Sequence, residues 1–588
     1  MGEADTPAGQ VPHDLVRSGC DRVVSQDLLP EASRHPPGRS LGPSFGLIAL
    51  LLGTLWFAGL GERWLLNPDE GRYAEIPREM LATGDWVTPR LNGIKYFEKP
   101  PLQYWATAAT YAAFGLGQGA ARLWPALLGV IGVLSMYRAT LRLWGSPTAV
   151  ATALILASSF LFIVAGHVLT LDMGTTGWLT VSLAAFLLAQ QDQAKPGERR
   201  QWMYVVWFGM ALAVLSKGLI GLVLPVGTLA IYMVWQRDWG LLHRLHLLWG
   251  LAILLAVCAP WFLLVSQRNP EFAQFFFVHE HFQRFTSEVH HRPGPWWYFL
   301  PVLVAGLLPW TGFLPGAVAA ALWPQPGYFQ PARLLLVWAG FILLFFSLSS
   351  SKLPFYILPV LPALAPLLAM QALCVDTRRL ARQAAVTALL GVAVAAGGLA
   401  LVLNLVPGDI LAGEPRQLGE WVILGGVALA LAAGVGAAAA SRGNRMLALL
   451  SLSVGMLLAV QVGALTHNAG LQGFSGHDLA EVIRPRLRPA TEIYALRHYD
   501  QSLPFYLRRT VVLVDYRDEF APGLDREPRH NSASFDDLVD RWRAGRPLLV
   551  LTDRRGRAAL EQSGLDSQVL YEDSKRYLLM PVGQGATP

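Results

Sequence analysis

The chain has 588 residues, of which 53% are hydrophobic and only 15% are charged, and its mean hydropathy is +0.38. This composition excludes a set of soluble domains and indicates a polytopic membrane protein, because many apolar segments approach the ~20 residues that cross a bilayer core. The net charge of +6 does not require a nucleic-acid partner, since most of the excess lies in connections between those segments. The three cysteines, Cys20, Cys258 and Cys374, show no metal-binding spacing, and none is placed for an extracytoplasmic disulfide.

Residues 1–43 precede the first apolar segment. They are rich in Pro, Gly and Arg and have no apolar period, which is typical of a disordered extension. The first apolar run begins too late and is too long for a cleavable signal peptide. We therefore expect a disordered extension on the cytoplasmic side.

Residues 44–466 carry the apolar segments, and we expect about thirteen transmembrane helices there. The segment 101–117 is ambiguous, but its Tyr and Trp residues suit the membrane interface, where we place it. The first outer loop would therefore hold amphipathic helices. The expected spans are 45–65, 120–143, 147–165, 170–190, 201–216, 219–236, 246–266, 296–322, 334–350, 355–373, 382–405, 419–441 and 444–465.

Lys and Arg recur in alternate connections between these spans, and the positive-inside rule places them on the cytoplasmic side. The first loop (66–119), the loop 267–295 and the chain from 467 onward would then lie outside. The basic residues are Arg138, Arg142, Lys195, Arg199, Arg200, Arg237, Arg244, Arg333, Arg378, Arg379, Arg382, Arg442 and Arg445.

Residues 467–588 have a different composition. TEIYALRHY, RTVVLVDY, RPLLVLTD and SQVLYEDSKRYLLMPV are typical of strands, and SLPFYL, FDDLVDRWRAG and RGRAALEQSG of helices. This alternation predicts a small extracytoplasmic α/β domain. It lacks a glycine-rich nucleotide loop, so we assign it no chemistry.

Ionisable residues that hydropathy does not predict collect on the expected outer side. Asp172, Lys217 and Lys352 lie at or inside helix ends, where charged residues are costly and usually functional. The first loop, with NPDEGRYAEIPREML (67–81) and NGIKYFEKPPLQYW (92–105), faces the same side. We predict one extracytoplasmic cavity.

Each feature also has a purely structural explanation. Asn67 can cap a helix that has Pro68 as its first residue and Asp69 in its first turn, and Pro77 would kink or end that helix. The pair Glu98–Lys99 can be a solvent-exposed ion pair of little energetic value. The other structural alternatives are helix capping by Asp172, snorkelling of Lys217 and Lys352, and solvation of His279 and His281.

The stretch NPDEGRYAEIPREM, followed by GDW and LNGIKYFEKPPLQYW, resembles the aminoarabinose (4-amino-4-deoxy-L-arabinose) transferases that modify lipid A. These are relatives of the protein O-mannosyltransferases in the GT-C class of membrane glycosyltransferases. The resemblance is strongest over residues 67–105 and extends more loosely through LTLDMGTTGWL, VLSKGLIGLVLP and SLSSSKLPFYILP. It does not cover residues 1–43.

The resemblance implies a GT-C fold and an inverting single displacement at the periplasmic face of the inner membrane. The donor would be undecaprenyl phosphate carrying aminoarabinose, and the acceptor would be lipid A, at its phosphates. A cationic sugar on those phosphates weakens binding of polymyxin and other cationic peptides, so resistance is the expected phenotype. We expect a monomer with no required cofactor.

The polyprenyl-phosphate leaving group gains negative charge as the glycosidic bond breaks, so preorganised cations there contribute most. Lys99 is the expected catalytic cation, with Arg72 beside it, Tyr96 as a hydroxyl donor and Arg284 on the facing loop. The remaining substrate-binding candidates are Tyr73, Lys217, Lys352 and Tyr356.

Two carboxylates are further catalytic candidates. In relatives that glycosylate a hydroxyl, the carboxylate at Asp69 would be the general base. A lipid A phosphate is already ionised at neutral pH, so we predict instead that Asp69 and Asp172 orient the sugar through its ammonium and hydroxyl groups. Glu98 beside His279 or His281 offers ligands for a divalent ion such as zinc, with a structural role, although only two protein ligands are apparent.

Three competing functions are compatible with parts of the sequence. A GT-C transferase with a protein hydroxyl or another lipid as acceptor shares most of these features. A lipid transporter or flippase usually has related halves and broken helices at the midplane, and no such repeat is visible. A receptor-like scaffold would leave the charged first loop unexplained.

Overall fold

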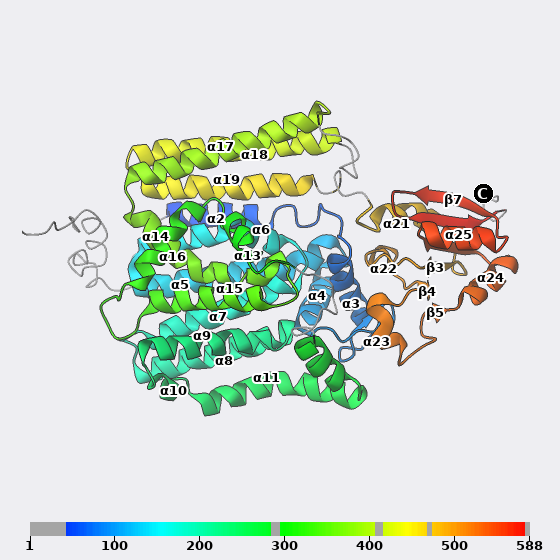
Figure 1. Ribbon diagram of the computed structural model, residues 1–588, viewed down its shortest axis with the longest axis horizontal. Helices are drawn as coiled ribbons and strands as arrows, with labels where there is room; N and C mark the ends of the chain where they lie inside the picture. Colours follow the sequence, from blue (N-terminus) through cyan, green and yellow to red (C-terminus); the bar gives the residue numbers. More distant parts are fainter. Residues whose placement is uncertain (1–42, 284–293, 406–414, 467, 469–472, 583–588) are drawn as a thin grey trace, which may run out of the picture.

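The computed structural model describes residues 43–283, 294–405, 415–466, 468 and 473–582, with the side chains of 43–49 and 279–283 excepted. A helical region is followed by an α/β domain, which sits on one end of it (Figure 1). The helices α3 (Asp69–Thr83) and α4 (Leu102–Phe114) lie between these two parts. The first outer loop therefore forms the floor on which the C-terminal domain rests.

Each expected span corresponds to a helix or a pair of helices. α5 covers the expected span 120–143 and the first part of 147–165, which α6 completes. It breaks at Gly145, whose φ of +83° favours glycine. The helices outside the first loop are α2 (Pro43–Phe57), α5 (Gln118–Ser158), α6 (Phe160–His167), α7 (Leu171–Gln190), α8 (Pro196–Lys217), α9 (Ile220–Gln236), α10 (Leu241–Arg244), α11 (Leu247–Arg268), η4 (Gln274–Gln283), α13 (Phe299–Gly306), η5 (Thr311–Phe313), α14 (Leu314–Leu322), α15 (Pro331–Leu348), η6 (Pro354–Ile357), α16 (Val360–Cys374), α17 (Thr377–Val402), α18 (Pro415–Ser441) and α19 (Arg445–Leu465).

The protein crosses the membrane several times. Among the described residues, seven helices are long and apolar enough to cross it, and a bent pair would make eight. That pair replaces the single helix expected at 296–322: α13 and the segment Thr311–Leu322 meet at 112°. Pro309, in the break, has no amide N–H with which to continue a helix. The total of thirteen crossings stays a prediction.

The first outer loop departs from the expected helix start. α3 begins at Asp69, and Pro68 precedes it with no side-chain cap. The Asn67 side chain does not cap α3, because its Oδ1 accepts a hydrogen bond from Ser502 N–H of the C-terminal domain at 2.8 Å. Pro77 lies inside α3 and does not end it; the helix packs between α4 and the C-terminal domain.

The C-terminal domain is built on a six-stranded sheet in the order β5-β4-β3-β6-β8-β7. β5, β4, β3 and β6 are parallel, β8 is antiparallel to them, and the edge strand β7 is antiparallel to β8. The predicted α/β class and every predicted strand and helix are confirmed. The elements are α21 (His477–Ile483), η8 (Arg484–Arg486), β3 (Glu492–Leu496), α22 (Leu503–Leu507), β4 (Val512–Val514), η9 (Asp518–Phe520), α23 (Ala521–Leu524), β5 (Ser532–Ala533), α24 (Phe535–Arg543), β6 (Leu548–Thr552), α25 (Arg554–Gln562), β7 (Ser567–Glu572) and β8 (Tyr577–Pro581).

The first loop and the C-terminal domain share one apolar core. Ile76 of α3 and Tyr104 of α4 are buried in the same cluster as Phe505 of α22. The hairpin of β1 (Arg90–Leu91) and β2 (Ile94–Lys95) adds polar contacts. Within it, Asn92 exchanges two hydrogen bonds of 2.8 Å with the Val511 backbone. The two parts are therefore joined over a broad surface.

Candidate active site

Arg72, in the first turn of α3, contacts two carboxylates. Its Nη1 donates to Asp69 Oδ1 at 3.0 Å, and its Nε donates to Glu519 Oε2 at 2.7 Å. Arg72 Nη2 also pairs with Glu519. All three guanidinium nitrogens are thus engaged, and Arg72 ties Asp69 to the C-terminal domain. The Asp69 side chain stays 41% exposed, so a substrate can reach it.

Glu519 is a site residue that the sequence did not reveal. It lies in η9, after β4, and is largely buried. Gln501 Nε2 donates to its second oxygen at 2.8 Å. Burial raises the pKa of Glu519 above its usual value, although Arg72 and Gln501 both favour the charged form. The C-terminal domain, to which the sequence assigned no chemistry, therefore contributes a carboxylate to this cluster.

Three tyrosines lie beside Arg72. The Arg72 guanidinium carbon is 5.7 Å from the Tyr96 ring centroid, and the Tyr73 and Tyr104 rings are 6.2 Å apart. Burial raises the pKa of all three phenols well above the usual value, so they remain neutral. Within the described part of the chain, the buried hydroxyls of Tyr96 and Tyr104 have no hydrogen-bond partner. Buried polar atoms are normally paired, so these hydroxyls can take a polar ligand.

Lys99 and Glu98 follow β2 and are both half-buried. Lys99 Nζ donates to the Glu98 carbonyl oxygen at 2.9 Å. Burial is the main cause of the raised pKa of Tyr96, and the charge of Arg72 opposes it. The nearby Glu98 carboxylate raises this pKa further. Glu98 therefore belongs to the same cluster as Arg72 and Tyr96, and we include Lys99 because it is bonded to the Glu98 backbone. We call Asp69, Arg72, Tyr73, Tyr96, Glu98, Lys99, Tyr104 and Glu519 the outer cluster.

A second group forms at the start of α7, the end of α8 and the short helix η6. Lys217, the last residue of α8, is paired with Asp172 in the first turn of α7. Its Nζ also lies 4.8 Å from the ring centroid of Tyr356 in η6. The structure thus brings together three residues that the sequence singled out from distant segments. We call Asp172, Lys217 and Tyr356 the inner cluster.

Lys352 lies at the end of the loop between α15 and η6. Its Nζ donates to the carbonyl oxygens of Ser347 and Ser349 at 2.9 and 2.8 Å. Burial lowers the pKa of Lys352. Its charge meets no carboxylate among the described residues, and its aliphatic chain packs against Gly294, where the outer loop returns. Lys352 is therefore a cation available to an anionic ligand.

A buried ion pair supports both clusters. Arg122, in α5, forms two hydrogen bonds of 2.7 Å with Glu70 of α3. Glu70 Oε1 also accepts from Leu169 N–H at 2.9 Å, just before α7 and Asp172. Burial alone would raise the pKa of Glu70, but the Arg122 and Arg63 charges lower it to about 2. The sequence did not single out this pair, because Arg122 lies at the edge of an expected span.

Two candidates lie outside what the structure describes. Arg284 falls in the gap at 284–293, and His279 lies in η4 but its side chain is not described. Among the described residues, no group of three or more His, Cys, Asp or Glu is placed to hold a metal ion. Glu98 therefore lacks a described ligand set, and the zinc hypothesis stays a prediction.

Most of the chain is similar to known proteins. It is 35% identical over 403 residues to the undecaprenyl phosphate-α-4-amino-4-deoxy-L-arabinose arabinosyl transferase of Edwardsiella ictaluri, covering 66% of this chain and 71% of that one. The chain belongs to the aminoarabinose transferase family. The model of the aminoarabinose transferase C-terminal domain matches residues 479–580, and that of the dolichyl-phosphate-mannose-protein mannosyltransferases matches residues 52–276.

Other aminoarabinose transferases extend the comparison. The arabinosyl transferase of Pseudomonas aeruginosa strain UCBPP-PA14 is 38% identical over 326 residues, which are 55% of this chain and 59% of that protein. The crystal structure of ArnT from Cupriavidus metallidurans bound to undecaprenyl phosphate is 37% identical and superposes with a TM-score of 0.86. That superposition covers 93% of this chain and 100% of the other. The match therefore includes both the helical region and the C-terminal domain, and the GT-C fold of the resemblance is confirmed.

Proposed function

We propose that this chain is a membrane glycosyltransferase that moves 4-amino-4-deoxy-L-arabinose from undecaprenyl phosphate to the phosphates of lipid A. The observation that carries the proposal is the similarity to a transferase bound to undecaprenyl phosphate over 93% of this chain. The grouping of carboxylates, cations and tyrosines at one end of the helices supports it. The same donor with a protein hydroxyl or another lipid as acceptor is the alternative that the experiment below separates.

In the proposed reaction, the bond between the anomeric carbon and the undecaprenyl phosphate oxygen breaks. An oxygen of a lipid A phosphate forms the new bond on the opposite face of the sugar, which inverts the configuration. The electron pair of the broken bond stays on the leaving phosphate. Fixed cations next to the leaving phosphate of undecaprenol provide the largest stabilisation of the transition state.

Lys99 and Lys352 are the residues we assign to phosphate groups. Neither role falls to Arg72, because its charge is already paired with the carboxylates of Asp69 and Glu519. Lys352 has a desolvated, uncompensated charge among the described residues, which suits a phosphate. We place the donor phosphate at Lys99, near Tyr96, and the acceptor phosphate at Lys352.

Asp69 and Asp172 orient the sugar in this proposal. An ionised phosphate needs no general base, so carboxylates at this site serve better as acceptors for the sugar ammonium and hydroxyls. Arg72 fixes Asp69, and Lys217 fixes Asp172. The neutral phenols of Tyr96 and Tyr104 are suitable donors to sugar oxygens.

The positive-inside pattern supports an inner-membrane protein with this site on the periplasmic side. Capping lipid A phosphates with a cationic sugar would give resistance to polymyxin. We propose a monomer whose transfer step needs no cofactor. Metal analysis of the purified protein and of its Glu98→Ala variant tests whether Glu98 and His279 hold zinc.

The test is mass spectrometry of lipid A from a transferase-deficient, polymyxin-sensitive strain expressing this protein or its Lys99→Ala variant. The proposal predicts an aminoarabinose mass increment that disappears in the variant. Unmodified lipid A, with good expression and the donor present, would contradict lipid A as acceptor and favour another acceptor in the same class. An increment that persists in Lys99→Ala would contradict the role of Lys99.

A further inference from the structure

The C-terminal domain presents the carboxyl ends of its parallel strands to the first outer loop. In open α/β sheets this edge normally takes the ligand, at the point where neighbouring strands connect in opposite directions. Here that point lies between β3 and β6, since β4 flanks β3 on its other side. Asp500 follows β3, and Arg576 precedes β8 next to the end of β6.

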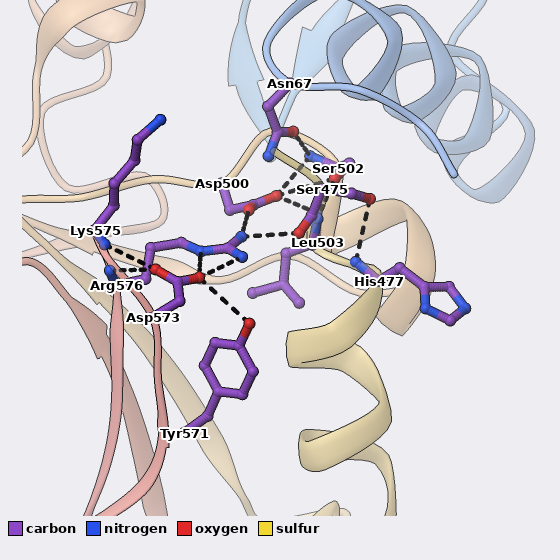
Figure 2. A network of polar contacts seen from close by, with 11 residues as sticks. Asn67, Ser475, His477, Asp500, Ser502, Leu503, Tyr571, Asp573, Lys575 and Arg576 are labelled. Carbon is purple, nitrogen blue, oxygen red and sulfur yellow. Dashed lines mark hydrogen bonds and ion pairs between the residues drawn. The ribbon is translucent and has the colours of Figure 1, made fainter. Parts of the chain in front are cut away.

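A buried ion pair between Arg576 and Asp500 occupies this point of the sheet edge (Figure 2). Arg576 Nη1 donates to Asp500 Oδ2 at 2.6 Å, and only 2% and 1% of the two side chains are exposed. Arg576 Nε also donates to Asp573 at 2.8 Å, and Arg576 Nη1 donates to the carbonyl of Ser475. A pair with this many partners holds the position of the Asp500 carboxylate.

The other oxygen of Asp500 sets the start of α22. Asp500 Oδ1 accepts from the N–H groups of Ser502 and Leu503, both at 3.1 Å, and from Ser502 Oγ at 3.0 Å. The same Ser502 N–H donates to Asn67 Oδ1 at 2.8 Å (Figure 2). The Asn67 N–H in turn donates to the Phe474 carbonyl oxygen at 2.8 Å. Asn67 is thus fixed by the C-terminal domain two residues before Asp69.

Gly71 shows how closely α3 approaches this point. A Cβ atom on Gly71 would lie 2.5 Å from Ser502 N and 2.6 Å from the Gln501 carbonyl carbon, so only glycine fits against that backbone. Asn67 and Gly71 bracket Asp69, and Arg72 follows directly. The backbone that carries these two site residues is therefore set by contact with Ser502.

We propose that Arg576, Asp500 and Asn67 are positioning residues for the transfer reaction, because they lock residues 67–72 against the C-terminal domain. The carboxyl edge of the parallel strands, where such sheets normally bind a ligand, instead contacts residues 67–72 of the first outer loop. This inference rests on the proposed function in taking Asp69 and Arg72 as site residues. None of the three positioning residues is assigned a contact with substrate.

The test compares the full-length protein in detergent with its Arg576→Met, Asn67→Ala and Gly71→Ala variants. Asn67→Ala and Gly71→Ala leave the Arg576–Asp500 pair intact, so they probe the contact even where Arg576→Met impairs folding. The matched control is Arg541→Met, which removes an arginine paired with Glu492 at 2.6 Å in the same domain, away from the first loop. Hydrogen exchange of the amides of residues 69–73 and the kinetics of transfer are measured for each.

We expect the three variants to raise exchange at residues 69–73 at least about tenfold. We expect kcat to fall about 100-fold, the cost of a small misplacement of reacting groups, while the KM for lipid A changes less than twofold. Arg576→Lys should recover part of the rate, and Arg541→Met should change neither readout. Asn67→Ala combined with Arg576→Met should be no worse than the more severe single variant.

Unchanged exchange at residues 69–73 would overturn the proposal, and so would raised exchange with an unchanged kcat. A loss of rate in Arg541→Met equal to that in Arg576→Met would also overturn it, because the effect would then be general to the domain. If the wild-type protein transfers no aminoarabinose, the proposed function fails. The exchange result alone then still decides whether the C-terminal domain holds residues 67–72.

Discussion

The inner and outer clusters are built in different ways. The inner cluster comes from the ends of α7 and α8 and from η6, and its Lys217–Asp172 pair needs no residue of the C-terminal domain. Several residues of the outer cluster lie on or next to the helix α3 of the first outer loop. Its central residue, Arg72, forms an ion pair with Glu519 of the C-terminal domain. One half of the candidate site is therefore intrinsic to the helical region, while the other half depends on docking. The predictions below separate these two halves.

Glu70 follows Asp69 of the outer cluster and accepts a hydrogen bond from Leu169, just before Asp172 of the inner cluster. Loss of its ion pair with Arg122 should therefore have the largest effect. Arg122→Met leaves the fully buried Glu70 carboxylate without its ion-pair partner, with only the more distant charge of Arg63. We expect a loss of about 3–5 kcal/mol in the free energy of unfolding, because an unpaired buried charge is strongly destabilising. Thermal unfolding of the detergent-solubilised protein measures it. Arg416→Met, which breaks an exposed pair, is the control and should change little.

The same pair predicts a dependence of stability on pH. Arg122 and Arg63 outweigh burial and hold the pKa of Glu70 at about 2, below its usual value of 4.5. Because the folded pKa is the lower one, this stabilisation is fully present above 4.5 and is lost as the pH falls from 4.5 towards 2. Unfolding temperatures between pH 6 and pH 3 should fall less steeply for Glu70→Gln than for the wild type. Parallel curves would contradict this account of Glu70.

The inner cluster should be sensitive to its charge and insensitive to the C-terminal domain. Lys217→Met leaves Asp172 partly buried and unpaired, and we expect kcat/KM to fall about 100-fold, as for a lost buried charge partner. The exchange of amides in residues 69–73 should not change, since the outer cluster keeps its contacts. Raised exchange in that segment would show that the two clusters are not separate.

Tyr356 should have the smallest effect. Its ring lies 4.8 Å from Lys217 Nζ, and such contacts contribute about 0.5–1 kcal/mol at accessible sites. We expect Tyr356→Leu to lower kcat/KM about fivefold and Tyr356→Phe to retain most of the rate, because phenylalanine keeps the ring face. A large loss in Tyr356→Phe would instead assign the hydroxyl a direct role in binding.

The sequence predicted the inner cluster better than the outer one for a physical reason. Asp172 and Lys217 lie at the ends of otherwise largely apolar helices, where an ionisable residue is costly and therefore conspicuous. Glu519 lies in the hydrophilic stretch DYRDEF, where a carboxylate is ordinary and nothing marks it as buried. Asn67 fits the local pattern of a helix cap, one of the structural alternatives, but its partner Ser502 is 435 residues away and no local pattern indicates it.

The features of the fold also divide into those that a local sequence pattern predicts and those that it does not. Helix positions and the α/β class follow from hydropathy and from the alternation of short elements, so they were predictable. The sharp bend after α13 and the passage of α3 through Pro77 depend on tertiary packing, which a local pattern does not encode. Docking of the C-terminal domain on the first loop belongs to the same class, since it depends on complementary surfaces of two distant segments.

The central claim is that the C-terminal domain completes the site through Glu519 and Arg72. A double-mutant cycle on the purified full-length protein, with Arg72→Met, Glu519→Gln and the combination, tests it through kcat/KM for aminoarabinose transfer to lipid A. The account predicts that each single change lowers kcat/KM at least about tenfold and that the double variant is no worse than the more severe single one, as for residues in contact. A Glu519→Gln variant with the wild-type rate, or losses that multiply in the double variant, would contradict it.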